Sequence, residues 1–126
     1  EDPLNVDAWT ILADTHLELG QSADALASFE QALHLQPDNL RLHYAVGTLL
    51  INLGESRRAI AHVRQFVDAN PEYLAATAAL ALAYAEADQC TEAIRWIDRA
   101  MALAGDTGQD PRIDDLRHRR ERCAVP

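Results

Sequence analysis

The chain carries apolar and polar positions in two periods, one inside short segments and a longer one that relates the segments to each other. Inside a segment, apolar residues recur every three or four positions, the spacing that places them on one face of an α-helix. Shifting the chain by 34 residues then superimposes one segment on the next. A fixed period of this length is typical of a stacked repeat architecture. Equivalent positions include Leu12, Val46 and Leu80; Ala25, Ala59 and Ala93; Phe29, Val63 and Ile97; and Pro3, Pro37 and Pro71.

Each unit is predicted to form two helices joined by a tight turn. Gly20 and Gly54 end the first helices, because glycine accepts the left-handed backbone that terminates a helix. Asp88 stands at this place in the third unit and tolerates that conformation better than most residues, so its φ should be positive. The units span about residues 6–39, 40–73 and 74–107, and helix caps are expected at Asn5, Ser22 and Ser56, with Cys90 at the third Ser position.

The helical spacing also predicts which side chains form the core. In the first helix of unit one the core stripe is Ala8, Trp9, Leu12, Ala13 and His16, and in unit two it is Leu42, His43, Val46, Gly47 and Leu50. The second helices are expected to bury Ala25, Leu26, Phe29, Ala32 and Leu33 in unit one, and Ala59, Ile60, Val63, Phe66 and Val67 in unit two.

After the third unit the register changes. Residues 105–109 are predicted to form a loop, and Asp110 then caps a last helix that has Pro111 at its first position. This helix, about 111–122, has Ile113 and Leu116 as its clear apolar residues. A polar-backed helix closes the open end of a repeat stack, so we expect it to lie on Ile94, Ile97 and Met101.

The pattern Trp9, Leu12, Ala13, Gly20, Ala25, Phe29, Ala32 and Pro37 resembles a tetratricopeptide repeat (TPR), and the resemblance covers about residues 3–104. The second unit departs from it at His43, Leu50 and Phe66, and the third at Thr77, Asp88 and Gly105. The resemblance implies an all-α solenoid, an alpha-alpha superhelix of three helix-turn-helix repeats plus a capping helix. It also implies one domain over residues 1–126 that binds peptides or proteins, without chemistry of its own. Because the chain opens at a repeat boundary, we expect it to be part of a longer protein.

The net charge of the chain and its distribution indicate which kinds of partner it can bind. The net charge is −9, and residues 1–39 hold eight acidic residues and no Arg or Lys, so a nucleic-acid partner is not expected. Residues 111–126 hold five Arg against three acids. The opposite charges at the two ends allow head-to-tail self-association. The alternative is that the acidic end contacts another repeat of the intact protein.

The sequence contains no recognisable catalytic, metal-binding or cofactor-binding motif. His16 and His43 fall on core stripes and are interpreted as packed histidines, whereas His34, His62 and His118 should be solvated or lie at the rim of the core. No run is long and apolar enough for a membrane span. Two unpaired thiols are the simpler expectation for Cys90 and Cys123, which would fit the cytoplasm. The alternative is a disulfide, since both residues should lie at the same end of neighbouring antiparallel helices, and it would favour an extracytoplasmic compartment.

The candidate binding surface is the side of the first helices that lies opposite the core and faces the concave groove. We expect a partner peptide or helix with apolar anchors over Tyr44, Ile51, Ala78 and Leu82, and a basic residue near Asp7 or Asp14. Arg41 alone cannot form a carboxylate clamp. Three alternatives remain: this side is covered by the chain itself or a second copy; the chain is an accessory segment of a glycosyltransferase or sulfotransferase; or it is a secretion or assembly chaperone. The groove residues are Asp7, Thr10, Asp14, Leu17, Arg41, Tyr44, Thr48, Ile51, Ala75, Ala78, Leu82 and Ala85.

Overall fold

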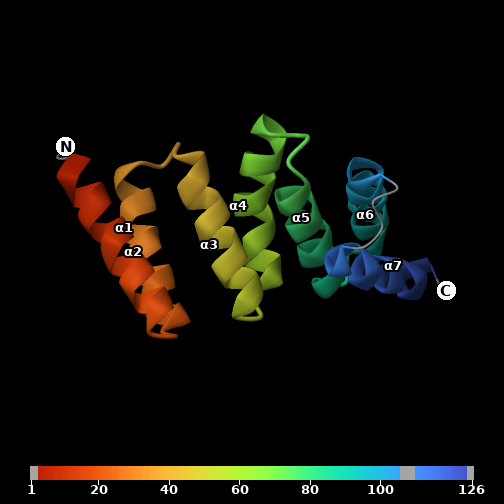
Figure 1. Ribbon diagram of the computed structural model, residues 1–126, viewed down its shortest axis with the longest axis horizontal. Coiled ribbons are helices and arrows are strands. Elements are labelled where there is room, and N and C mark those ends of the chain that lie inside the picture. The colour runs from red at the N-terminus through yellow and green to blue at the C-terminus, as the bar shows by residue number, and fades with distance from the viewer. Residues whose placement is uncertain (1–2, 106–109, 125–126) are drawn as a thin grey trace.

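The computed structural model describes residues 3–105 and 110–124, with the side chains of residues 3 and 4 left aside. Within these residues it contains seven helices and no strand, which confirms the all-α prediction. Three helix pairs stand side by side along the long axis of the molecule, and α7 lies crosswise at the C-terminal end (Figure 1). The helices are α1 (Pro3–Glu18), α2 (Ser22–Leu35), α3 (Leu40–Asn52), α4 (Ser56–Ala69), α5 (Leu74–Glu86), α6 (Cys90–Ala104) and α7 (Pro111–Ala124).

The turns inside the pairs have the predicted left-handed backbone. Gly20 has φ 74° and Gly54 has φ 81°, and Asp88 adopts φ 59° in the third pair. At this last turn the backbone nitrogen of Gln89 donates to the carbonyl oxygen of Tyr84 at 2.9 Å. That bond satisfies a carbonyl group that the helix end would otherwise leave free. The turn reverses the direction of the chain, so the two helices of a pair are antiparallel, and it recurs every 34 residues.

The predicted starts of α3, α5 and α7 are confirmed, whereas those of α1, α2, α4 and α6 were wrong by one to three residues. Helix α1 begins at Pro3, so Asn5 lies inside it rather than capping it. Proline's fixed φ suits the first position of a helix, and this favours the earlier start. Ser22, Ser56 and Cys90 are first helical residues instead of caps, because the two-residue turn already uses the position before them. Ser56 has a different partner, since its hydroxyl donates to the Glu86 carboxylate at 2.6 Å.

The core consists of two clusters that meet at α3 and α4. The predicted stripes of α2, α3 and α4 are buried, apart from Leu33 and Ile60, which are half-buried. In α1, Ala13 is fully buried and Trp9 and His16 are half-buried, but Leu12 is 41% exposed and Ala8 is also exposed. Their assignment to the core was therefore wrong. The reason is positional: among the described residues no helix precedes α1 to cover this side.

Gly47 lies where α3 packs directly against the backbone and side chain of Val63 in α4. A Cβ added there would overlap Cγ2 of Val63 and would lie 3.3 Å from the Val63 backbone nitrogen. The equivalent positions in the other two pairs hold Ala13 and Ala81. The second pair is thus packed more closely at this point than a repeat with alanine would be.

The histidines separate into two environments. His43 is 6% exposed, as expected of a packed histidine, and its Nε2 donates to the Pro37 carbonyl oxygen at 2.7 Å. With Nε2 as the donor, Nδ1 of His43 accepts from Nδ1 of His62 at 3.0 Å. His62, predicted to be a solvated or rim residue, is half-buried beside His43. Burial is the main cause that lowers the pKa of His62; His43 and Arg58 lower it further, whereas Glu30 opposes them. His16 bonds to the Gln21 side chain at 2.7 Å, and His34 and His118 are exposed.

Helix α7 begins as predicted, with an Asp110 carboxylate oxygen accepting from the backbone nitrogen of Arg112 at 3.0 Å. Ile113 and Leu116 are buried in the cluster that contains Ile97, with Met101 packed against it, as expected. Ile94 does not belong to this cluster. The predicted loop falls largely on residues 106–109, which lie outside the described residues. Helix α7 contacts α5 as well as α6, which the sequence did not indicate.

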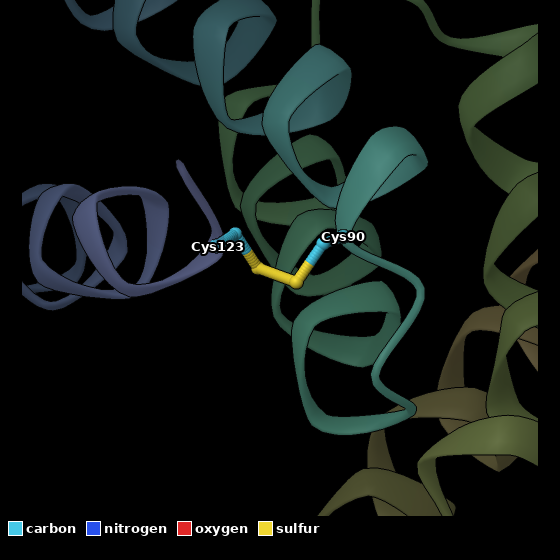
Figure 2. Close-up of a disulfide and its surroundings, with 2 residues drawn as sticks. All are labelled: Cys90 and Cys123. Atoms are coloured by element: carbon cyan, nitrogen blue, oxygen red, sulfur yellow. A yellow bond between two sulfur atoms is a disulfide. The ribbon is translucent and has the colours of Figure 1, made fainter. Parts of the chain in front are cut away.

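The C-terminal end of α7 is joined covalently to α6. Of the two alternatives for the cysteines, the structure has the disulfide between Cys90 and Cys123, with their Cα atoms 5.2 Å apart (Figure 2). Cys90 opens α6 and Cys123 lies in the last turn of α7. Two ion pairs join α7 to the helix pair at other points, Arg120 with Asp98 at 2.6 Å and Arg119 with Glu86 at 3.6 Å.

Candidate binding groove

A pocket of about 250 Å³ lies between α3, α5 and α7, on the side formed by the first helices of units two and three. Its floor is apolar, because α5 contributes small residues that leave room and α3 contributes larger side chains at the edge. Tyr44, Ile51 and Leu82 are half-buried there. Six of the predicted groove residues meet in this pocket: Tyr44, Thr48, Ile51, Ala75, Ala78 and Leu82.

Helix α7 supplies a wall that the sequence analysis missed. Arg112, Asp115 and Leu116 line the pocket opposite α3. Leu116 is buried and closes the floor, whereas Arg112 and Asp115 are exposed and place two opposite charges at the rim. No signal in the repeat pattern could have located them, since α7 lies outside the 34-residue period and its direction depends on its contact with α5.

Tyr44 is held in place by aromatic contacts. Its ring stacks on Phe66 with centroids 4.7 Å apart, and Tyr73 lies 6.1 Å away. Burial, and then the proximity of Tyr73, raise the pKa of the Tyr44 hydroxyl, while Arg112 opposes this. The hydroxyl is therefore neutral at physiological pH and can both donate and accept a hydrogen bond at the rim. Arg112 is oriented by its own ion pair with Asp110 at 2.8 Å.

The unit-one residues of the predicted surface do not line this pocket. Asp7, Asp14 and Leu17 are exposed on α1, and the Thr10 hydroxyl donates to the carbonyl oxygen of Val6 at 2.9 Å. Two others lie apart from it as well. Arg41 is exposed, and Ala85 lines a separate hollow beside the disulfide.

The described part of the chain brings no three His, Cys, Asp or Glu side chains together in an arrangement that could hold a metal ion. Among the same residues, no helix has the length and apolarity needed to cross a membrane. What the site offers is an apolar hollow with a phenol, a guanidinium and a carboxylate at its edge. Such a surface can bind a side chain and orient it by hydrogen bonds.

Antiparallel helix pairs, a left-handed turn in each pair and a groove lined by the first helices define a tetratricopeptide-repeat domain. Domains of this class are protein-interaction modules. Within the class, the chain belongs to the family described as the cytochrome c-type biogenesis protein H TPR domain, whose model matches residues 1–111.

Comparison with individual proteins supports the fold. The first TPR domain of Spaghetti (RPAP3), solved with the HSP90 peptide SRMEEVD, superimposes with a TM-score of 0.79 at 16% identity, covering 98% of this chain and 96% of that one. The TPR2B domain of yeast Sti1, solved as a complex with pHsp70, gives a TM-score of 0.72 at 12% identity, covering 95% of this chain and 96% of that one. The human PEX5-related protein is 29% identical over 73 residues, which are 58% of this chain but only 12% of that protein.

Proposed function

We propose that this domain is the binding module of a cytochrome c-type biogenesis protein, and that it holds an apolar side chain of a partner polypeptide in the groove between α3, α5 and α7. The single observation that carries the proposal is the 250 Å³ apolar hollow between Tyr44, Ile51 and Leu82. A cavity of about 150 Å³ already holds a benzene molecule. The hollow thus has room for a leucine or phenylalanine side chain.

Charged side chains at and near the rim of the hollow would orient the bound partner. Arg112 and Asp115 lie at the α7 edge, and the exposed carboxylates of Asp7 and Asp14 lie towards the N-terminal end of the same row of first helices. A partner helix with an apolar anchor in the hollow would place a basic residue near those carboxylates. This is the arrangement in which an amphipathic helix fills a groove. It is also a specific form of the assembly-chaperone alternative, since an apolar segment is held until it is needed.

The family's description suggests the probe, namely the polypeptide of a c-type cytochrome prepared without its haem, compared with the folded haem protein. In the folded protein the apolar side chains are buried, so only the haem-free chain should bind. Ala75→Phe fills the hollow from α5 and should weaken binding by roughly tenfold or more. Ala61→Phe is the matched control, because Ala61 is exposed on α4 and outside the groove.

Leu82→Glu, which places a charge in the hollow, should weaken binding while the helical circular dichroism signal and the melting temperature stay near wild type. Unfolding by Leu82→Glu would identify Leu82 as core and would contradict the groove. Equal binding by wild type and Ala75→Phe, measured by isothermal titration, would contradict it as well.

A further inference from the structure

Helix α7 is both a wall of the groove and the helix that the disulfide tethers. Arg112, Asp115 and Leu116, in its first half, line the groove. Cys123, in its last turn, is bonded to Cys90, the first residue of α6 (Figure 2). Leu116 and Cys123 are seven positions apart, which is about 10 Å along one helix. A displacement of the tethered end therefore moves the wall as well.

The disulfide shares the attachment of α7 with noncovalent contacts of limited extent. Two of the 14 residues of α7, Ile113 and Leu116, are buried. Its ion pairs to α5 and α6 are half-buried or exposed, and such pairs contribute little. An isolated helix of this length is only marginally stable in water, so α7 depends on being docked. Loss of the disulfide should therefore shift α7 towards an undocked state.

The disulfide lies at the edge of the core, within reach of a thiol from solvent. Cys90 and Cys123 are both half-buried rather than buried. They line a hollow of about 230 Å³ together with Ala85, Asp88, Arg119 and Arg122. Since Asp88 and Arg122 are exposed, this hollow is open to solvent beside the two sulfur atoms.

The side chains around the hollow favour thiolate chemistry. Arg119 and Arg122 bring two guanidinium groups to it, while one lining carboxylate, that of Asp88, opposes them. A nearby cation stabilises a thiolate, both the one that attacks a disulfide and the one that leaves it. Cys90 is the first residue of α6, where the helix dipole stabilises a negative charge. Cys90 is thus the better leaving group, and Cys123 is the sulfur that is attacked.

We propose that a protein dithiol enters this hollow and reduces the bond between Cys90 and Cys123, and that the reduction undocks α7 and removes the third wall of the groove. The oxidised domain then holds its partner, and the reduced domain releases it. The inference rests on the proposed function, because it concerns regulation of the same groove.

The exchange proceeds in two steps. First, one thiolate of the dithiol attacks Sγ of Cys123; the bond to Cys90 breaks, a mixed disulfide forms, and Cys90 leaves as a thiolate. Second, the other thiolate of the dithiol attacks its neighbour's sulfur in the mixed disulfide, and Cys123 leaves. The dithiol loses two electrons and two protons and becomes a disulfide, and the two cysteines gain them and become thiols.

Reduced thioredoxin is the protein dithiol for the first test. Mass spectrometry after alkylation should find both cysteines of the domain alkylated once thioredoxin has acted, and neither alkylated before. A bond that thioredoxin leaves intact would overturn the inference.

The rate of reduction by dithiothreitol tests the role of the hollow. Arg122→Gln should slow it about threefold at low salt, since it removes one cation near the attacked sulfur, and the difference should vanish at high salt. Arg117→Gln is the matched control, because Arg117 is exposed on α7 and does not line the hollow. Arg119 is kept, since it also pairs with Glu86 at 3.6 Å. Equal rates in the two variants would contradict entry through this hollow.

Amide hydrogen exchange shows whether α7 undocks, and it needs no partner. In the reduced wild type, protection should fall in residues 113–120, while α1 to α4 stay as protected as in the oxidised protein. The double variant Cys90→Ser/Cys123→Ser should match the reduced protein with and without reductant. Unchanged protection of α7 after reduction would overturn the inference.

Binding measurements separate this inference from the proposed function. The probe is the haem-free polypeptide of a c-type cytochrome with any cysteine of its own alkylated, so that it cannot exchange with the domain. Isothermal titration should show about tenfold weaker binding to the reduced domain, since the groove loses the apolar contact of Leu116. Equal affinity for both forms would contradict this inference alone. No binding by either form would contradict the proposed function, and this inference with it.

Discussion

Replacing Cys90 and Cys123 with Ser removes the covalent link between α6 and α7 and tests how α7 is held. The bonded residues are 33 positions apart. In the chain-entropy model, a closed loop of that length contributes about 3.7 kcal/mol to the free energy of unfolding. The noncovalent attachment of α7 comes from the buried side chains of Ile113 and Leu116 and from ion pairs to α5 and α6 that are half-buried or exposed. The disulfide is therefore one of several comparable contributions that keep α7 docked.

Urea denaturation of the oxidised wild type and the double Ser variant measures this difference. We expect the variant to lose about 2–4 kcal/mol of stability, and its melting temperature to fall by roughly 10 °C. Amide hydrogen exchange should show where the loss falls. Protection should decrease first in residues 113–120, because within the described part of the chain α7 contacts only the last helix pair and can open without the rest of the stack.

The controls separate the bond from the serine side chains. A reducing agent should lower the stability of the wild type to that of the variant and leave the variant itself unchanged. Ellman titration of the unreduced protein should find no free thiol. Two free thiols per chain, or a double variant within about 0.5 kcal/mol of the wild type, would refute the reasoning, because the loop term would then be absent.

Two further perturbations test the second repeat. Burial and His43 lower the pKa of His62, so just below the ordinary histidine pKa of about 6.5 the unfolded chain binds more protons than the folded chain. The free energy of unfolding should therefore fall as the pH drops from 7 towards 5. His62→Gln should flatten this slope in urea titrations, and an unchanged slope would contradict the pairing. Gly47→Ala should cost about 1–2 kcal/mol through overlap with Val63, and a Val63→Ala background should remove most of that cost. A stabilised single variant would show that the two helices can move apart.

The local geometry was predictable because it depends on single residues and short spacings. Gly20 and Gly54 fix two turns, and Asp88 adopts the same left-handed backbone where glycine is absent. The helix starts were less well defined, because Ser22 and Ser56 satisfy the sequence rule for a cap while the tight turn places them one position later. A helix cap is a single residue, and the hydrogen bonds of the turn decide which residue takes that position.

The burial of a side chain was predictable where its helix has a neighbouring helix on both sides, and it was not predictable elsewhere. Val46 and Leu12 are equivalent in the repeat, yet the first is fully buried and the second is 41% exposed. Helical spacing identifies the apolar side of a helix but not whether another helix covers it. The contact between His62 and His43 is a second case, because it joins residues that are 19 positions apart. No local pattern contains that contact.

The candidate groove shows which parts of a site the repeat pattern can predict and which parts it cannot. Tyr44 and Leu82 could be assigned to one surface because the 34-residue period aligns α3 with α5. The third side comes from α7, which has no equivalent in the earlier units. Its position follows from the burial of Leu116 against the last pair and from the disulfide at its far end. Since Arg112 and Asp115 stand on that side, the charged contacts that would select a partner depend on tertiary packing outside the repeat. Two domains with the same repeat residues and a different last helix should therefore bind different partners.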